Sequence, residues 1–464
     1  MSSSVWTEFL VASRFLGLLF HHNRYLTHLH LPAIIFDGDE EDARHCLDGL
    51  AGLHYLQHLT LHNAALAQRT IFALLRACLA LPRLKELFLD FTADWEDDVH
   101  QHMPELETTI ADALRARSSA LSSAIKITAL QLPESESDMN PLVFPLLESG
   151  LLDLESCTIP QFGSDNHPDL IERTVRERCP RLRHLRCLSL WRASLDVQDT
   201  CAFIRGCSHL KTFRGNDEIN HCGGTGDILR QIASTLVQCH SSTLEEIKVL
   251  QCTRFSSKDQ RSILSQCKQL KRFWIVPHEY GGCGVSFKDL VEAAWMCAEL
   301  EELGLTMTRY IEFEEESGEL IGGLAGFARR PCVIKQKQAI AVGMVKRLYA
   351  RIGQLRNLRV LSLGADKSWG DVTGFEWDLT LPNGGLDELA GLKDLADFEM
   401  RTNLWSGMGQ AEVEFMDEQW PRLRKITFGT WSTTFKELMM EPHWLWLQAQ
   451  RPQLQFGWTN PANE

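Results

Sequence analysis

A short apolar phrase recurs along this chain of 464 residues: one apolar residue, two intervening positions, a second apolar residue, one position, and a third. Its first copies are Leu26-Leu29-Leu31, Leu56-Leu59-Leu61 and Leu84-Leu87-Leu89. The step of three is close to a helical step and the step of two is a strand step, so the phrase predicts a turn entering a short strand. Its period of about thirty residues is typical of a solenoid, in which each repeat contacts only its neighbours.

Later copies keep the spacing with other apolar residues. They are Leu185-Leu188-Leu190, Leu244-Ile247-Val249, Leu270-Phe273-Ile275, Leu300-Leu303-Leu305, Leu358-Leu361-Leu363, Leu395-Phe398-Met400 and Leu423-Ile426-Phe428, with weaker fits at Leu210-Phe213, Ile125-Ile127 and Leu152-Leu154. Between the phrases, residues 68–81, 169–179 and 339–355 carry the three- and four-residue apolar spacing of helices. We therefore expect one parallel sheet with helices outside it. Its strands should lie near residues 30, 60, 88, 189, 248, 274, 304, 362, 399 and 427.

Cysteines mark the boundaries of several phrases. Cys179, Cys207, Cys239, Cys267 and Cys297 stand before a phrase, whereas Cys157 and Cys252 stand after one. With "LPRLKEL", "CPRLRHL" and "WPRLRKI", these residues make the chain resemble leucine-rich-repeat proteins, and within them the cysteine-containing, RNI-like F-box/leucine-rich-repeat proteins, including large fungal sets. The resemblance implies an α/β horseshoe with a parallel concave sheet and helices on the convex side. It also implies substrate recognition in a ubiquitin ligase.

The resemblance covers residues 24–457, read as about thirteen irregular units with insertions near 131–148 and 306–338. Residues 1–23 are expected to form a capping helix and residues 458–464 a tail. An F-box would precede the repeats and open with Leu-Pro, but the only early Leu-Pro, Leu31-Pro32, runs into "AIIFDGDEED". No F-box is expected in this chain, so either the product is truncated or the protein works without one. A ligase adaptor is expected as a partner only if an F-box exists upstream.

Net charge and hydropathy reduce the classes of partner that are expected. The chain has 47 basic and 61 acidic residues, a formal charge of −14, and no large block of Lys and Arg, which argues against nucleic acid as the main partner. The sequence contains no run of 18 apolar residues, so no membrane span is predicted. Near the N-terminus, Glu8, Ser13 and Arg14 interrupt the apolar stretch that a signal peptide would need. The 14 cysteines are therefore expected as thiols in the cytoplasm or nucleus.

Candidates for metal or catalytic chemistry are weak. His28, His30 and His58 should face outward on adjacent strands, but their spacing does not establish a zinc site. The cysteines lack paired two-residue spacing, and Cys179 and its counterparts Cys207, Cys267 and Cys297 are expected to be buried and unlinked. No nucleophile lies in a known motif. We therefore expect that the protein has no enzymatic activity and binds no cofactor and no metal.

Three polar or glycine-rich stretches also lack a ligand motif. "HCGGTGD" (221–227) and "YGGCG" (280–284) are not followed by Lys-Ser or Lys-Thr and are predicted to be loops. "DGDEED" (37–42) lacks the glycine and the glutamate of a calcium loop and is predicted to start a helix, where acidic residues complement the dipole.

What remains is a surface for binding protein. Outward residues of the strands should line the concave face, Cys187 and Ser189 among them. Arg272 and Trp274 are expected at its centre. They should point outward because Phe273 and Ile275 fill the inward slots. Exposed Trp and Arg are typical anchors of interfaces. The candidate protein-binding residues are Phe88, Trp191, Arg214, Glu246, Lys248, Arg272, Trp274 and Glu302. The protein is expected to bind a protein substrate or partner there. An F-box-independent scaffold and a small-GTPase activator are the alternatives.

Overall fold

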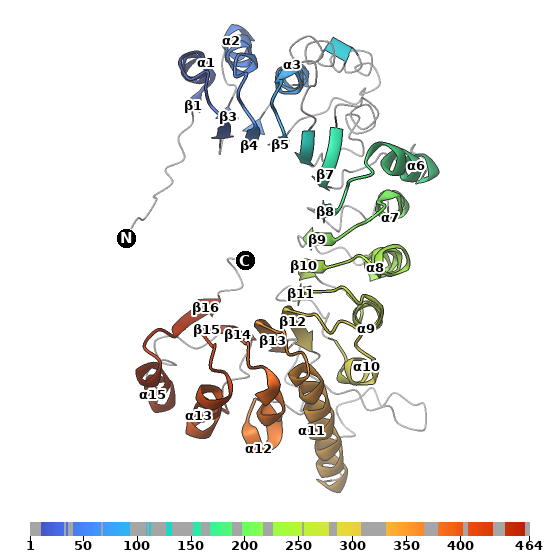
Figure 1. Ribbon diagram of the computed structural model, residues 1–464, viewed down its shortest axis with the longest axis vertical. Helices are drawn as coiled ribbons and strands as arrows, with labels where there is room; N and C mark the ends of the chain where they lie inside the picture. Colours follow the sequence, from blue (N-terminus) through green and yellow to red (C-terminus); the bar gives the residue numbers. More distant parts are fainter. Residues whose placement is uncertain are drawn as a thin grey trace. The chain divides into compact units, whose positions relative to one another are not determined.

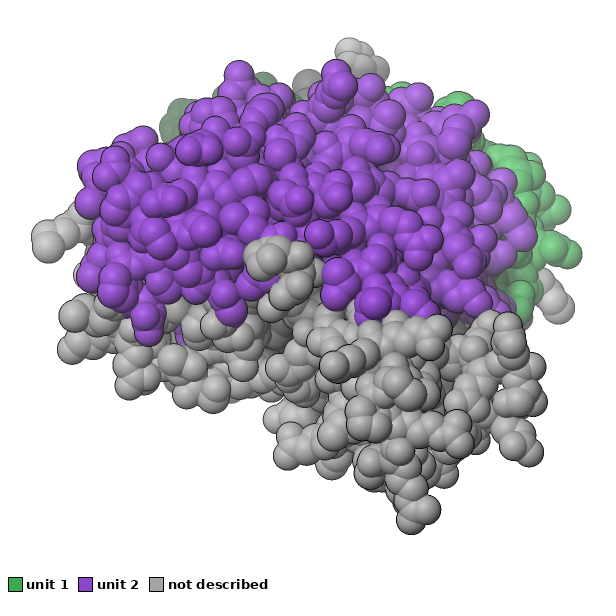
Figure 2. Space-filling model, turned by 90° about the horizontal axis from the view of Figure 1, so that it is seen from below, with its two compact units in different colours: residues 1–188, 192–210 green, residues 189–191, 211–464 purple. Residues whose placement is uncertain are grey.

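A computed structural model describes most of the repeat region. The described residues are 11–31, 34–35, 40–65, 68–92, 108, 111–112, 127–131, 152–158, 168–187, 197–216, 226–252, 255–277, 285–307, 331–365, 379–401, 407–429 and 441–459. The chain divides into two compact units, coloured separately in Figure 2. Unit 1 comprises Met1–Leu188 and Arg192–Leu210, and unit 2 comprises Ser189–Trp191 and Lys211–Glu464.

Unit 1 contains one parallel sheet with helices on one side of it (Figure 1). Its strands are β1 (Val11–Ala12), β2 (His28–Leu31), β3 (Ile34–Ile35), β4 (His58–Ala65), β5 (Glu86–Thr92), β6 (Ile127–Gln131), β7 (Leu152–Thr158) and β8 (His184–Cys187). They are ordered β1-β3-β4-β5-β6-β7-β8, and β2 also pairs with β4. The helices are α1 (Ser13–His22), α2 (Glu40–Ala51), α3 (Gln68–Ala80), α6 (Pro168–Arg178) and α7 (Val197–Gly206).

Unit 2 repeats this plan, with its strands paired in chain order. They are β9 (Thr212–Asn216), β10 (Glu246–Cys252), β11 (Arg272–Pro277), β12 (Glu302–Met307), β13 (Val360–Ala365), β14 (Asp397–Arg401), β15 (Lys425–Gly429) and β16 (Gln455–Thr459). Its helices are α8 (Gly226–His240), α9 (Ser257–Gln266), α10 (Phe287–Glu292), α11 (Pro331–Gly353), α12 (Leu381–Gly384), the 3-10 helix η4 (Leu386–Gly391), α13 (Gln410–Gln419) and α15 (Pro442–Gln450). They too lie on one side of the strands (Figure 1).

Strand register explains the recurring phrase. In unit 2 the middle apolar residues are aligned across neighbouring strands, so that they stack into one core beneath the sheet. These residues, each at most 1% exposed, are Phe213, Ile247, Phe273, Leu303, Leu361, Phe398 and Ile426. The first apolar residue lies in the turn, where Leu270 and Leu300 are fully buried. The predicted fold is therefore confirmed: a leucine-rich-repeat solenoid with parallel strands on one side and helices on the other. The helices predicted at 68–81, 169–179 and 339–355 are α3, α6 and α11.

The strand predicted near residue 189 was placed wrongly. Strand β8 ends at Cys187, and the phrase there is Leu182-Leu185-Cys187, whose members are 0%, 2% and 4% exposed. Cys187 therefore points into the core and does not line the concave face. A small apolar thiol can fill the last inward slot of a phrase, and Leu185 and Leu188 offered a second, false register. Ser189 and Trp191 lie outside the described residues.

Cys157 also lies within a strand, not after one. It pairs with Leu130 and Leu185 in the middle inward slot and is 8% exposed.

Strand β16 was not predicted, although Phe456 continues the middle slot from Ile426. Its signal is weak because only one residue separates Leu454 from Phe456, one fewer than in the other phrases.

The four phrase-boundary cysteines that were predicted to be buried and unlinked behave as predicted. Cys179, Cys207, Cys267 and Cys297 are at most 2% exposed and form no disulfide. Burial raises the pKa of the Cys267 thiol to about 12 and that of Cys297 to about 11, so both are protonated near neutral pH. Cys239, at the end of α8, is exposed.

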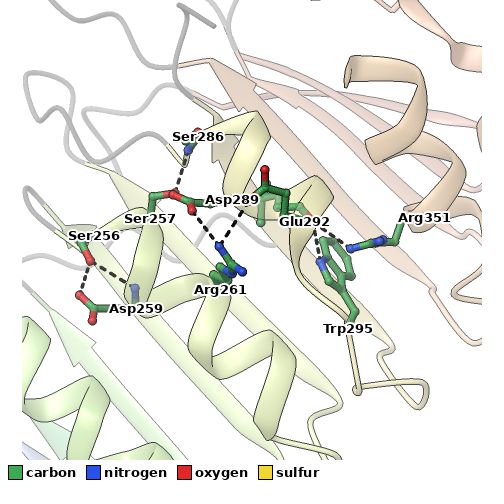
Figure 3. A network of polar contacts seen from close by, with 10 residues as sticks. Ser256, Ser257, Asp259, Arg261, Ser286, Asp289, Glu292, Trp295 and Arg351 are labelled. Atoms are coloured by element: carbon green, nitrogen blue, oxygen red, sulfur yellow. Dashed lines mark hydrogen bonds and ion pairs between the residues drawn. The ribbon is translucent and has the colours of Figure 1, made fainter. Parts of the chain in front are cut away.

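Polar contacts join neighbouring repeats on the helix side of unit 2 (Figure 3). Ser256 caps α9 by accepting a hydrogen bond from the backbone N–H of Asp259 at 3.2 Å. The next residue, Ser257, donates to Asp289 on α10 at 2.6 Å, and Arg261 approaches the same carboxylate at 3.4 Å. Adjacent helices are therefore fixed to each other by side chains as well as by the core.

Candidate protein-binding face

The outward positions of β9 to β12 form two rows on the face of the sheet that points away from the helices, which we call the concave face. The first row contains Thr212, Glu246, Arg272 and Glu302, and the second contains Arg214, Lys248, Trp274 and Gly304. Parallel pairing places neighbours in each row on adjacent strands, about 4.8 Å apart. Six of the eight predicted binding residues lie in these two rows.

Glu246 is the centre of an ion-pair cluster. Its side chain is 2% exposed, and its carboxylate accepts a hydrogen bond from Arg214 Nε at 2.6 Å on one side. On the other side, Arg272 donates through Nε at 2.6 Å and lies within 2.5 Å through Nη2. Burial alone would raise the pKa of Glu246, but the hydrogen bonds from both arginines outweigh it and hold that pKa below its ordinary value. The carboxylate therefore stays ionised and fixes both guanidinium groups.

A second cluster lies at the residues just before these strands. Glu245 accepts hydrogen bonds from Lys211 at 2.6 Å and from Lys271 at 3.0 Å. These two bonds lower the pKa of the Glu245 carboxyl. These residues were not among the predicted binding residues, although they occupy one repeated position, directly before the first outward residue of each strand.

Trp274 points outward as predicted, and its ring lies against the next strand. A methyl group added to Gly304 would lie 2.7 Å from Trp274 Cδ2, closer than non-bonded carbons approach. Lys248 Nζ, from the strand on the other side, is 5.9 Å from the centre of the indole ring, within range of a cation–π interaction. Glycine at position 304 therefore makes room for the ring. The indole remains half-buried, with partners on both neighbouring strands.

Glu302 extends the first row and differs from Glu246. Burial raises the pKa of its carboxyl above the ordinary value, and the nearby charges of Arg272 and Lys248 oppose that rise without cancelling it. Its ionised form is therefore less favoured in the folded protein than in the unfolded chain.

The other two predicted binding residues are not part of this cluster. Phe88 is half-buried on β5 of unit 1, between Thr60 and Gln131 in the register, and Trp191 lies outside the described residues. The concave face also contains buried outward residues that were not predicted to be buried. Ser362 and Glu399 continue the row of Gly304 and are 1% and 9% exposed.

The histidines form a short stack in unit 1. The rings of His28 and His58 lie 4.2 Å apart and nearly parallel, and His58 Nδ1 is 2.8 Å from Glu86 Oε2. The predicted outward orientation on adjacent strands is confirmed for His28 and His58 by their pairing. Across the described residues, no group of three or more His, Cys, Asp or Glu is arranged to hold a metal ion.

The known structures that resemble this chain are distant from it in sequence and score low in structural superposition. No family model matches the sequence, and no curated protein matches it. Among solved structures, an internalin from Listeria monocytogenes is 11% identical with a TM-score of 0.35, over 89% of this chain and 79% of that one. Rad7, solved in complex with Elc1 from yeast, is 12% identical with a TM-score of 0.39, over 96% of this chain and 88% of that one. LegL7, a leucine-rich-repeat protein of Legionella pneumophila, is 12% identical with a TM-score of 0.27, over 59% of this chain and 83% of that one. Such low scores carry no argument about partners.

Within the described ranges, no helix combines the length and the apolar composition needed to cross a bilayer.

Proposed function

We propose that this protein is a binding module that recognises another protein through the concave face of β9 to β12. The observation that carries the proposal is the side-by-side placement of Arg272 and Trp274. The buried Glu246 carboxylate fixes Arg272, and Gly304 makes room for the Trp274 ring. Trp and Arg are the residue types in which interface energy concentrates. Solenoid repeats characteristically use such extended concave surfaces for binding.

Within this role, substrate recognition in a ubiquitin ligase of the F-box type is the finer proposal. Its support is the cysteine pattern of the repeats, which resembles F-box/leucine-rich-repeat proteins. A scaffold that acts without a ligase and an activator of small GTPases are the alternatives. An F-box encoded upstream, together with binding of a ligase adaptor, would favour the first. Stimulated GTP hydrolysis by candidate GTPases would favour the last.

A photo-crosslinking residue tests the face directly. Placed at Lys248, on the concave face, it should capture a partner that mass spectrometry can identify. Placed at Lys258, exposed on α9, it serves as the matched control and should not capture the same protein. Capture from Lys258 but not from Lys248 would contradict the proposal.

Trp274→Ala then measures what the anchor contributes. Truncation of an interface anchor costs about 2 kcal/mol or more, so we expect capture of the identified partner to weaken at least about tenfold. The melting temperature should change little, because the indole lies on the concave face and not in the core. Unchanged binding with a lowered melting temperature would move the recognition surface elsewhere.

A further inference from the structure

The register of β9 to β11 gathers cationic side chains that are scattered in the sequence. Lys211, Arg214, Lys248, Lys271 and Arg272 come from three successive repeats, yet they lie together on or beside the concave face of unit 2. The chain as a whole carries a formal charge of −14. Five cationic side chains therefore gather around Glu245 and Glu246 on an acidic protein, and no run of Lys and Arg in the sequence revealed this cluster.

The two arginines retain donors after their contacts with Glu246. A guanidinium group has five N–H donors. Among the contacts of the described residues, Arg214 uses Nε, and Arg272 uses Nε and Nη2, on the Glu246 carboxylate. The side chains remain 58% and 38% exposed. Their remaining donors are therefore accessible to a ligand at the face.

Glu246 acts here as a positioning residue. A carboxylate that is 2% exposed and bonded on both sides holds two long side chains in one geometry before any ligand arrives. Restricting side chains in advance lowers the entropy that binding would otherwise lose. Charge-assisted bonds from arginine to a planar anion are also strong and directional. The expected ligand is therefore an anion that accepts from both guanidinium groups.

We propose that this face binds an acidic segment of a partner protein, whose carboxylates accept hydrogen bonds from Arg214 and Arg272 beside Lys248. The inference rests on the proposed function and adds the chemistry of the partner to it. Trp274, in the same row as Lys248, offers its indole to an apolar side chain of that segment. The partner is thus an acidic segment that also carries an apolar or aromatic residue.

Charge complementarity favours protein over nucleic acid as the occupant. Glu245, Glu246 and Glu302 lie among the cations, so the face alternates in sign along the row. A phosphate backbone is bound by several uncompensated cations in succession, each adding to the salt dependence. Separate carboxylates, spaced along a peptide, fit an alternating row better.

A displayed library of random 12-residue peptides provides the test. It is selected against the full chain, against Arg214→Gln/Lys248→Gln, and against Arg422→Gln as a control. Arg422 is an exposed arginine paired with Asp394 at 2.7 Å, outside the β9 to β12 face. The double variant keeps Arg272 on Glu246, so the buried carboxylate is not left unpaired. Melting curves confirm that all three proteins are folded.

The expected result is an enriched pool with at least a twofold excess of Asp and Glu over the unselected library. The excess should disappear with the double variant and persist with the control. A neutral or basic pool, a pool without enrichment, or an acidic excess that survives in the double variant would each overturn the proposal. So would tighter binding of a labelled single-stranded DNA 20-mer than of the best peptide, with the same dependence on Arg214 and Lys248. If Trp274→Ala still abolishes partner capture in any of these cases, the proposed function stands without the acidic partner.

Glu246→Gln separates positioning from simple charge. The substitution removes one negative charge from the face, so charge alone predicts that a synthetic copy of the best acidic peptide would bind more tightly. Positioning predicts the reverse, because the two guanidinium groups lose their shared anchor. We expect binding to weaken about fivefold to tenfold in fluorescence anisotropy. Equal or tighter binding by folded Glu246→Gln would overturn the positioning role.

Discussion

The outward rows of the two units differ, although buried apolar side chains fill the inward slots of both units. In unit 1, His28, His58 and Glu86 follow one another across β2, β4 and β5, where the two imidazole rings stack and His58 pairs with Glu86. In unit 2 the corresponding row alternates Glu246, Arg272 and Glu302 around a buried carboxylate. Inward residues must fit a shared core, whereas outward residues meet only their strand neighbours and a partner. The outward rows can therefore specialise without altering the repeat.

Inward substitutions should affect the two units alike, and they give the largest effect. Phe273 in β11 and Leu59 in β4 occupy the middle inward slot and are fully buried. Loss of apolar contacts and the remaining cavity should lower the free energy of unfolding by about 3–5 kcal/mol for Phe273→Ala and about 2–5 kcal/mol for Leu59→Ala. Urea unfolding followed by circular dichroism measures both. A loss below about 1 kcal/mol at either position would mean that its slot is not part of a packed core.

Outward ion pairs should distinguish the units. Arg214→Gln/Arg272→Gln leaves the Glu246 carboxylate buried without its two partners, which should destabilise the protein by about 3 kcal/mol. In unit 1, Glu86→Gln removes the partner of His58, but these side chains are 39% and 29% exposed, so the change should stay within about 0.5 kcal/mol. Urea unfolding of the two variants provides the comparison. Equal losses would remove the distinction between the rows.

Much of this architecture follows from the spacing of apolar residues, because a strand between fixed inward slots has few alternatives. Phe273, Ile275 and the outward position of Trp274 were predictable on that basis. Cys187 was not, since Leu185 and Leu188 gave an equally good but shifted phrase. The contacts of Glu246 with Arg214 and Arg272 depend on register between repeats of unequal length, which one sequence does not specify. The role of Gly304 could not be predicted from the sequence either, because it depends on the direction in which the Trp274 ring turns.

Gly304→Ala should affect recognition more than stability. The added methyl would lie 2.7 Å from Trp274 Cδ2, so the ring must turn away from β12. Because the indole is on the concave face, the free energy of unfolding should fall by only about 1 kcal/mol. Partner capture should fall nearly as far as in Trp274→Ala, because the anchor is displaced. Gly457→Ala is the matched control, since its new methyl would lie 3.2 Å from Thr427 Oγ1, far from the indole in the register. Capture that is unchanged in Gly304→Ala would show that the ring orientation does not matter.

The smallest expected effect concerns Glu302, and its sign is opposite to that of Glu246. The folded-state pKa of Glu302 is raised, mainly by burial, so the folded protein binds more protons there than the unfolded chain does. Its ionised form therefore reduces stability once the pH exceeds the ordinary glutamate value of 4.5. Glu302→Gln should raise the free energy of unfolding at pH 7 by no more than about 0.5 kcal/mol, and the gain should vanish below pH 4.5.

The folded-state pKa of Glu246 is lowered, so its ionised form stabilises the fold above pH 4.5, and that contribution is lost on acidification. Glu246→Gln should therefore flatten the acid limb of the stability profile, whereas Glu302→Gln should flatten the decline toward neutral pH. Urea titrations between pH 3 and pH 7 measure both profiles. Loss of stability at pH 7 in Glu302→Gln would show that Arg272 and Lys248 outweigh burial at that carboxylate.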